Sequence, residues 1–395
     1  MLINLFLIPF LSLVIFLQVF YLVNSLLLIP RKKQAHKKVV LPTKKITTIV
    51  PLFNSETTID KCLASLLRNN SRAIEKVILV LDHCKDNSEN IAKLSAEKFS
   101  KKNIVFKIVR LKRGLSGKTS ALLAGIKHAK TANILLLDAD ILLAKNAVQK
   151  MLQFHLKNKN LYSTCLIYPQ PQKHPTLISQ LICNDRLYRQ NILQIVRNKY
   201  DVSNFPGGVA IVNAQKYKRF LKKGFLEDLS ATYQILSSQN KVSLLPKVLA
   251  YEVERQSIKG LFFQRIRWTM GNIENIYQLK RAVLSNKSLL KKTLILSYPL
   301  MWYFQHYFIT MGLMFFLISQ SFIKFIYIIP LLAYSGQVFF SSQINKGLYK
   351  STAPGLILHC VFFPLIVTAA LFGALITLFI KKKFYFKTDI LFNRI

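Results

Sequence analysis

The strongest pattern in this chain is the gathering of apolar residues at its two ends. Residues 2–29 carry no charge, and a helix of that length can cross a hydrocarbon layer of about 30 Å. A cleaved signal peptide would have a shorter apolar core and a small-residue cleavage site, so residues 1–30 are predicted to form an uncleaved transmembrane anchor. The basic residues that follow favour a cytoplasmic next segment and an outside amino terminus. They are Arg31, Lys32, Lys33, Lys37, Lys38, Lys44 and Lys45.

Residues 291–380 are predicted to hold about three more transmembrane helices, in apolar runs at roughly 293–318, 323–341 and 356–380. One crossing plus three puts the carboxyl terminus outside. The basic tail 381–395 opens with three lysines, which favours the cytoplasm instead. Either one apolar run does not span, or the charge rule does not hold at this end. Four spans are the expectation.

Between the two ends, residues 31–290 are predicted to form a cytoplasmic domain in which short apolar runs alternate with amphipathic stretches. The predicted strands are 46–50, 76–81, 104–110 and 133–137, and the predicted helices are 57–67, 88–99 and 118–129. This order favours an α/β fold with a parallel, doubly wound sheet. Ligands bind beyond the carboxyl ends of such strands, where Asn54, Asp82 and Asp138 fall, so these residues predict one site.

Composition narrows the class of protein. The chain of 395 residues is 51% hydrophobic, too apolar for an ordinary soluble protein. Its net charge of +39 fits contact with anionic membrane lipids and, compatibly, an anionic substrate. No aromatic-and-basic RNA-binding signature and no zinc-finger spacing occurs, so nucleic acid is not an expected partner. The five cysteines lie far apart and form no disulfide or metal pattern, which suggests a reducing compartment.

Acidic residues follow two of the predicted strands. At the end of the fourth strand, Asp138 could contact a ribose, and Asp140 could hold Mg²⁺ or Mn²⁺, because these ions prefer oxygen ligands. The structural alternative is that Asp140 caps a helix. At the end of the second strand, Asp82 could accept a hydrogen bond from a uracil N–H. For the nearby Asp86 we favour a turn in which Asp86 or Ser88 caps the next helix.

Glycines mark two further places where a ligand could approach. Lys118 opens a helix after a glycine-bearing loop, a useful position for binding a diphosphate. The loop is not a P-loop, because that motif needs glycine where Lys112 stands. Gly207 and Gly208 form a pair at which another group could come close to the backbone. In both places an ordinary turn is the alternative.

A second acidic pair opens a later predicted helix. Asp228 is the candidate general base that would deprotonate an acceptor hydroxyl, with Glu227 beside it. The structural alternative is two acids favourably placed at a helix amino terminus.

The pentapeptide Gln264-Arg265-Ile266-Arg267-Trp268 lies on a predicted amphipathic, interfacial helix near 260–280. Gln264, Arg267 and Trp268 are spaced i, i+3 and i+4, so they share one helix face. Arg267 could meet a departing diphosphate, and Trp268 could stack on a sugar ring. The alternative is a membrane-surface helix with its arginines and tryptophan at the lipid headgroups, and the two interpretations are compatible.

In this order and spacing, the chain resembles the family 2 glycosyltransferases, particularly their membrane-embedded branch of polysaccharide synthases and ceramide glucosyltransferases. The resemblance covers about 45–275 and the flanking spans. The matching positions are Val50, Pro51, Asn54 and Glu56 of the opening turn, Asp82, Lys118 of the G-K segment, Asp138 and Asp140 of D-x-D, Glu227 and Asp228 of T-E-D, and the complete Q-x-x-R-W of Gln264, Arg267 and Trp268. The departures are Ser55, His83, Lys85 and Leu226.

The resemblance implies a GT-A (Rossmann-like) fold flanked by transmembrane helices, a UDP-sugar donor, and Mg²⁺ or Mn²⁺. It implies inverting transfer of a sugar, glucose or N-acetylglucosamine, to a lipid or a growing polysaccharide through a β-linkage. Three carboxyl-terminal spans are few for an export tunnel, which favours a single glycolipid product. The expected location is a bacterial inner membrane, and a partner membrane subunit remains open. The competing hypothesis is a non-catalytic membrane subunit or scaffold that retains a nucleotide-sugar fold.

Overall fold

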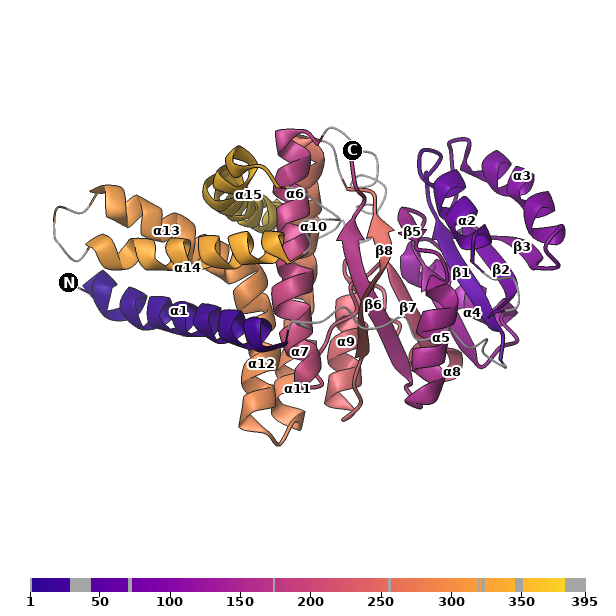
Figure 1. Ribbon diagram of the computed structural model, residues 1–395, viewed down its shortest axis with the longest axis horizontal. Coiled ribbons are helices and arrows are strands. Elements are labelled where there is room, and N and C mark those ends of the chain that lie inside the picture. Colours follow the sequence, from indigo (N-terminus) through magenta and orange to yellow (C-terminus); the bar gives the residue numbers. More distant parts are fainter. Residues whose placement is uncertain are drawn as a thin grey trace.

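The protein is described here by a computed structural model, which covers residues 2–28, 44–69, 73–172, 175–254, 257–318, 320, 324–344 and 351–380. It consists of a sheet-containing domain and a group of apolar helices, with two helices, α6 (Leu177–Tyr188) and α10 (Ile258–Glu274), between them (Figure 1). The basic residues 31–43 and the basic tail 381–395 lie outside the described residues.

The strands of the domain form one mixed sheet in the order β3-β2-β1-β4-β7-β6-β8-β5 among the described residues. Their bounds are β1 Ile46–Leu52, β2 Ile74–Leu81, β3 Val105–Arg110, β4 Asn133–Leu137, β5 Ile141–Leu143, β6 Tyr162–Pro169, β7 Val209–Asn213 and β8 Ser243–Glu252. The first four strands are parallel, as predicted. The predicted parallel order does not extend to the rest of the sheet, because β7 runs antiparallel to both β4 and β6. A buried apolar run has the same pattern in either direction, so the pattern cannot reveal its orientation.

Side chains on the two faces of the sheet pack under different helices. Along β1, Ile49 packs with the core under α4 and α9, whereas its neighbour Val50 packs with the core under α2, α3 and α5. Such alternation follows from the two-residue period of a strand. The helices are α2 Ile59–Leu67, α3 Ser88–Ser100, α4 Lys118–His128, α5 Ala147–Lys157, α8 Ala214–Lys218 and α9 Glu227–Ser237. The helices predicted at 57–67, 88–99 and 118–129 are thus confirmed within two residues.

A second group of helices lies on the side of the sheet that faces the apolar helices. The polypeptide from residue 177 to 199 is continuously helical, with a π-helical stretch in its middle. The elements of this group are α6 Leu177–Tyr188, η2 Arg189–Gln194, α7 Ile195–Lys199, α10 Ile258–Glu274 and α11 Ile276–Ser285. The interfacial helix predicted near 260–280 therefore corresponds to α10 and the start of α11.

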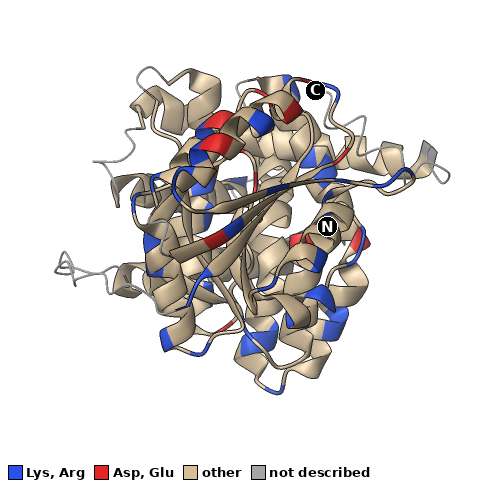
Figure 2. Ribbon diagram, turned by 90° about the vertical axis from the view of Figure 1, so that its right-hand side faces the viewer, with Lys and Arg blue, Asp and Glu red and all other residues tan. Residues whose placement is uncertain are grey.

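Four helical segments are long and apolar enough to cross a membrane: Leu11–Leu28, Leu289–Ile318, Lys324–Gln343 and Ala353–Phe379. The elements that contain them are α1 Leu2–Leu28, α12 Leu289–Pro299, η3 Leu300–Phe304, α13 Gln305–Ile318, α14 Lys324–Gln343 and α15 Ala353–Ile380. The helices α1, α13 and α14 lie lengthwise side by side and extend away from the sheet (Figure 1). Lys and Arg also occur over the face away from these helices (Figure 2), so membrane contact alone does not account for the positive charge.

Candidate active site

Two of the predicted strand ends meet the amino end of α4. At the end of β2, Asp82 is 8% exposed, and its Oδ2 accepts a hydrogen bond from the Gly117 N–H at 2.7 Å. Burial raises the pKa of the Asp82 carboxyl, and the Gly117 hydrogen bond lowers it by a smaller amount. At the end of β4, the Asp138 Oδ2 accepts a hydrogen bond from the Lys118 Nζ at 2.7 Å. The α4 terminus therefore joins the two acids that the sequence assigned to donor binding.

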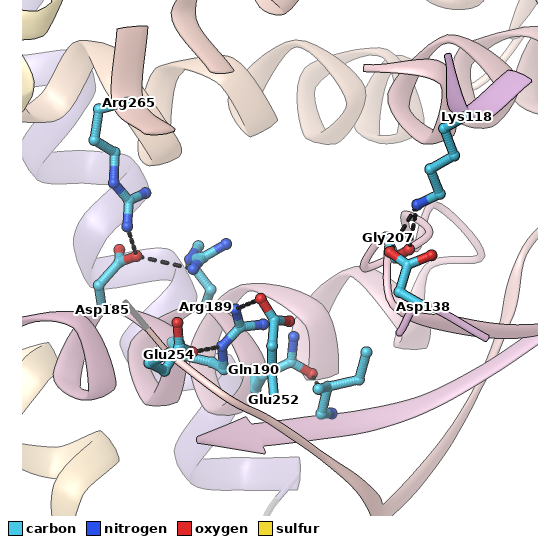
Figure 3. Close-up of polar contacts among 11 residues, drawn as sticks. Lys118, Asp138, Asp185, Arg189, Gln190, Gly207, Glu252, Glu254 and Arg265 are labelled. Atoms are coloured by element: carbon cyan, nitrogen blue, oxygen red, sulfur yellow. Dashed lines mark hydrogen bonds and ion pairs between the residues drawn. The ribbon is translucent and has the colours of Figure 1, made fainter. Parts of the chain in front are cut away.

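Lys118 is the cation at the centre of this site (Figure 3). Besides Asp138, its Nζ donates to the Gly207 carbonyl oxygen at 3.0 Å and lies 3.0 Å from the Glu227 Oε1. Burial alone would lower the pKa of Lys118, but the nearby carboxylates, Asp138 first, outweigh burial and raise it well above its ordinary value. Lys118 is therefore held as an ammonium group that connects β4, the glycine turn and the start of α9.

The glycine pair allows two close approaches, and one of them is to the candidate base. Gly207 has a φ of +88°, and a Cβ there would lie 2.8 Å from the Asp228 Oδ2. A Cβ on Gly208 would lie 2.5 Å from the Cδ1 of Ile141 in β5. Gly207 thus leaves room for the Asp228 carboxylate, and Gly208 leaves room for sheet packing.

Asp228 has the electrostatic environment of a proton acceptor that works near neutral pH. Its Oδ1 accepts a hydrogen bond from the Leu229 N–H at 2.8 Å. Burial and the Glu227 carboxylate raise the pKa of Asp228 to about 6, against the opposing effects of Lys118 and Arg267. A carboxylate with a pKa near 6 is ionised at pH 7 and is a stronger base than an ordinary aspartate.

The two acids of the D-x-D sequence fit a metal ion that also binds substrate. Asp138 and Asp140 lie close enough together that the Asp140 charge raises the pKa of Asp138. Within the described ranges no group of three or more His, Cys, Asp or Glu side chains is arranged to hold a metal. Mg²⁺ commonly takes one or two carboxylates and completes its shell with phosphate oxygens and water, so a two-carboxylate set fits such an ion. The alternative that Asp140 caps a helix is wrong, because the next element is β5.

The residues predicted in the first turn hold two loops together. Asn54 Oδ1 accepts a hydrogen bond from the Lys85 N–H at 2.9 Å, and Glu56 Oε2 accepts one from the Asn87 N–H at 2.9 Å. Asp86 accepts from the Ser88 N–H, as expected for a turn before α3. Pro51, predicted in the turn, lies inside β1. For Asn54, Glu56 and Pro51 a substrate contact stays a prediction.

The side chains of the Q-x-x-R-W sequence point in different directions on α10. Arg267 acts on the catalytic side, because its charge lowers the pKa of Asp228. Trp268 packs toward the apolar helices, with its ring centroid 5.7 Å from that of Trp302. The buried Oε1 of Gln264 has no hydrogen-bond partner among the residues that the structure describes. Arg265 is 1% exposed and donates to Asp185 at 2.8 Å, so it does not lie at lipid headgroups as the membrane-surface alternative required.

Sequence reasoning missed a buried charged cluster on α6 and η2. Asp185 and Arg189 form an ion pair one helical turn apart, and Arg186 pairs with Glu252 and Glu254. The available signal was the presence of an acid and two arginines within a run of otherwise apolar and uncharged polar residues, 177–194.

The mixed α/β sheet covered by helices has the GT-A fold, and carboxylates, a lysine and a glycine turn lie at its strand ends. The family model described as glycosyl transferase family 2 matches residues 47–221. Residues 47–221 are therefore assigned as a family 2 glycosyltransferase domain.

Known relatives and one solved structure agree with this assignment. A poly-β-1,6-N-acetyl-D-glucosamine synthase of Staphylococcus epidermidis is 23% identical over 273 residues, which cover 66% of this chain and 64% of that protein. An uncharacterized glycosyltransferase of Bacillus subtilis, EpsJ, is 28% identical over 157 residues, 40% of this chain and 44% of that protein. The fold matches that of a mannosyltransferase from Pyrobaculum calidifontis, solved with GDP-mannose and Mn²⁺ (TM-score 0.56, 17% identity, covering 94% of this chain and all of that one).

Proposed function

We propose that the protein is an inverting, membrane-bound glycosyltransferase that moves glucose or N-acetylglucosamine from a UDP-sugar to a lipid or a growing polysaccharide. The observation that carries this proposal is the Asp228 carboxylate, buried against Gly207 beside the Lys118 cluster, with a pKa near 6. The name of the staphylococcal relative favours N-acetylglucosamine and a β-linkage.

In the proposed mechanism, Asp228 accepts the proton of an acceptor hydroxyl, and that oxygen attacks the anomeric carbon from the face opposite the diphosphate. The product is then β-linked. Arg267, which already acts on Asp228, offsets negative charge on the departing UDP. Asp82 orients the uracil, and Asp138 the ribose. A Mg²⁺ or Mn²⁺ ion held by Asp140 would supply charge neutralisation at the diphosphate when bound.

The test is UDP release by the detergent-purified protein from a panel of UDP-sugars, with GDP-mannose included and with Mn²⁺ or Mg²⁺ added. The catalytic variant is Asp228→Asn. Its matched control is Asp201→Asn, an aspartate at the surface that pairs with Lys241. Release from one donor that is lost in Asp228→Asn and kept in Asp201→Asn supports the proposal. Near-normal turnover by Asp228→Asn would refute the base assignment.

The product separates the two acceptor classes. A ladder of products indicates polysaccharide elongation, and one glycolipid band indicates a single transfer. Binding of a donor without turnover under any condition would favour the non-catalytic membrane subunit or scaffold instead.

A further inference from the structure

The buried carboxylate of Asp185 holds two guanidinium groups at one point between the sheet domain and the apolar helices. Asp185 is 1% exposed, and its Oδ2 lies 2.8 Å from Arg265 and 2.9 Å from Arg189, both through Nη2 (Figure 3). These partners come from α6, η2 and α10. The nearby Arg189 and Arg265 cations keep the pKa of Asp185 below its usual range despite its burial, so it is ionised at neutral pH.

Both of these arginines lie over the same tryptophan. The Cζ of Arg265 is 4.3 Å from the ring centroid of Trp268, and the Cζ of Arg189 is 5.0 Å from it. Arg189 also lies 4.8 Å from the ring of Trp302 in η3. Cation–π contacts at these distances are attractive, so the indole position depends on where the two cations are fixed.

Trp268 is adjacent in sequence to Arg267, the residue whose charge acts on Asp228. We propose that Asp185 is a positioning residue for glycosyl transfer: through Arg265 and Arg189 it fixes the Trp268 indole, and with it the part of α10 that carries Arg267. The catalytic part of this inference rests on the proposed function of Asp228. Its structural part, the dependence of Trp268 on Asp185, does not.

A neighbouring cluster provides a matched control. Arg186 is nearly as deeply buried as Asp185 and pairs with Glu252 and Glu254, so it connects α6 to the end of β8. Glu254→Gln therefore removes one buried carboxylate, as Asp185→Asn does, but one that pairs with Arg186 rather than with Arg189 and Arg265. Loss of a buried charge pair costs stability in both variants.

Intrinsic fluorescence tests the structural part, because Trp268 and Trp302 are the two tryptophans of the chain. Asp185→Asn should change the emission maximum, Asp185→Glu should restore most of it, and Glu254→Gln should leave it near wild type. In UDP release, Asp185→Asn should lower kcat by about tenfold or more, since a misplacement near 1 Å can cost about a hundredfold. The KM for the donor should stay within about twofold of the wild-type value.

Native emission together with an unchanged kcat in Asp185→Asn would overturn the proposal. Equal changes in Asp185→Asn and Glu254→Gln would also overturn it, because they would show a general effect of lost buried charge. If Asp185→Asn does not fold, Arg189→Lys supplies the same test, since lysine keeps the charge but lacks the planar fork that reaches both Asp185 and the indole. The emission measurement remains decisive even if no donor is turned over.

A separate observation concerns α15, the last apolar helix. Its first turn meets α6, where the Asn184 Nδ2 donates to the Gly355 carbonyl oxygen at 3.4 Å. Toward its other end, a Cβ on Gly373 would lie 2.8 Å from the Ile266 Cδ1 of α10. The helix between these two contacts is about 27 Å long at 1.5 Å per residue. Thus α15 rests against the helices of the sheet domain over most of its length.

The helices α1 and α14 meet the helices of the sheet domain over a shorter stretch than α15 does. Among the side chains described in α1, Leu17 and Tyr21 pack near the sheet domain, whereas Leu11 packs against Tyr327 of α14. In Figure 1, α1, α13 and α14 are seen lengthwise, while α15 is strongly foreshortened and so runs across them. If α1, α13 and α14 cross the bilayer, α15 lies along it.

We infer that α15 does not cross the membrane but lies along its hydrocarbon, beneath α6 and α10. Its side chains turned away from these helices, including Phe362, Phe372 and Ile376, are at least half exposed and would contact lipid tails. An immersed helix is apolar on all sides, in contrast to the amphipathic helix of a membrane surface, and α15 carries no charge. Three crossings remain, and the carboxyl end of α15 stays on the side of the sheet domain, as the three lysines after it require.

The test compares two positions in the full-length chain. One short epitope is inserted within residues 345–350, between α14 and α15, and another is added at the carboxyl terminus. Protease accessibility is then measured in intact cells and in inverted vesicles. The inference expects both epitopes to face the same compartment, with an epitope at Gln320 facing the other. Opposite compartments for the first two epitopes would show that α15 crosses and would overturn it.

Discussion

Replacing Gly207 by alanine should displace the Asp228 carboxylate, the candidate base, while leaving that residue itself unchanged. The new Cβ would lie 2.8 Å from the Asp228 Oδ2, well inside van der Waals contact, so either the carboxylate or the turn must move. The positive φ of +88° adds a backbone cost of about 1–2 kcal/mol for any residue with a Cβ. A shift of the base near 1 Å can cost about a hundredfold in rate, so we expect kcat to fall about tenfold to a hundredfold.

Gly114→Ala is the control that separates these two effects. Gly114 has a φ of +85°, but a Cβ there would have no atom within 4 Å. Both variants should therefore lose about 1–2 kcal/mol of unfolding free energy from the backbone, and Gly207→Ala should lose more because of its clash, as measured by thermal unfolding in detergent. UDP release should fall only in Gly207→Ala. If Gly207→Ala kept the turnover of Gly114→Ala, the argument that Gly207 makes room for a catalytic Asp228 would be refuted.

Three further predictions concern the same site. The kcat/KM for the donor should rise with pH through about 6, because burial and Glu227 raise the pKa of Asp228 and only the ionised carboxylate accepts a proton. A kcat/KM profile that is flat from about pH 5 to 8 would contradict this prediction. Lys118→Met should weaken UDP binding at least about tenfold in a titration, because methionine leaves Asp138 and Glu227 without a cation between them, whereas Lys118→Arg should retain part of the affinity. Equal UDP affinities of the wild type and Lys118→Met would contradict this prediction. EDTA should abolish UDP release, and added Mn²⁺ or Mg²⁺ should restore it. Without donor, EDTA should hardly change the midpoint of thermal unfolding, since no group of three or more metal ligands is arranged in the described part of the chain. A large fall in that midpoint would indicate a structural metal instead.

The elements of the sheet domain were predictable where their signals are local. The strand 133–137 and the helices beginning near residues 59, 88 and 118 follow from apolar periodicity over a few residues. The acids at the ends of β2 and β4 were predictable for the same reason, because a strand end is visible in the sequence around it. The direction of β7 was not, since a short buried run pairs equally well in either direction until its neighbours are placed.

Partners distant in the sequence decided the rest of the site. Lys118 was assigned to a diphosphate from its local context, but its charge is balanced by Asp138 and Glu227, which come from a strand and a helix elsewhere in the domain. Asp185 carried no motif, and its importance emerged only from Arg265, 80 residues later. Long-range pairs leave no periodic trace in a single sequence.

By itself, the sequence determined the resemblance to family 2 glycosyltransferases, the apolar ends and the acids available for chemistry. These depend on residue type and short spacing, which the order of the chain contains directly. Only the tertiary structure decided that Gly207 faces Asp228, that two arginines cover Trp268, and that α15 rests against α6 and α10. The physical reason is that these relations come from the packing of whole elements, in which excluded volume and burial of charge select among arrangements that local propensity leaves equivalent.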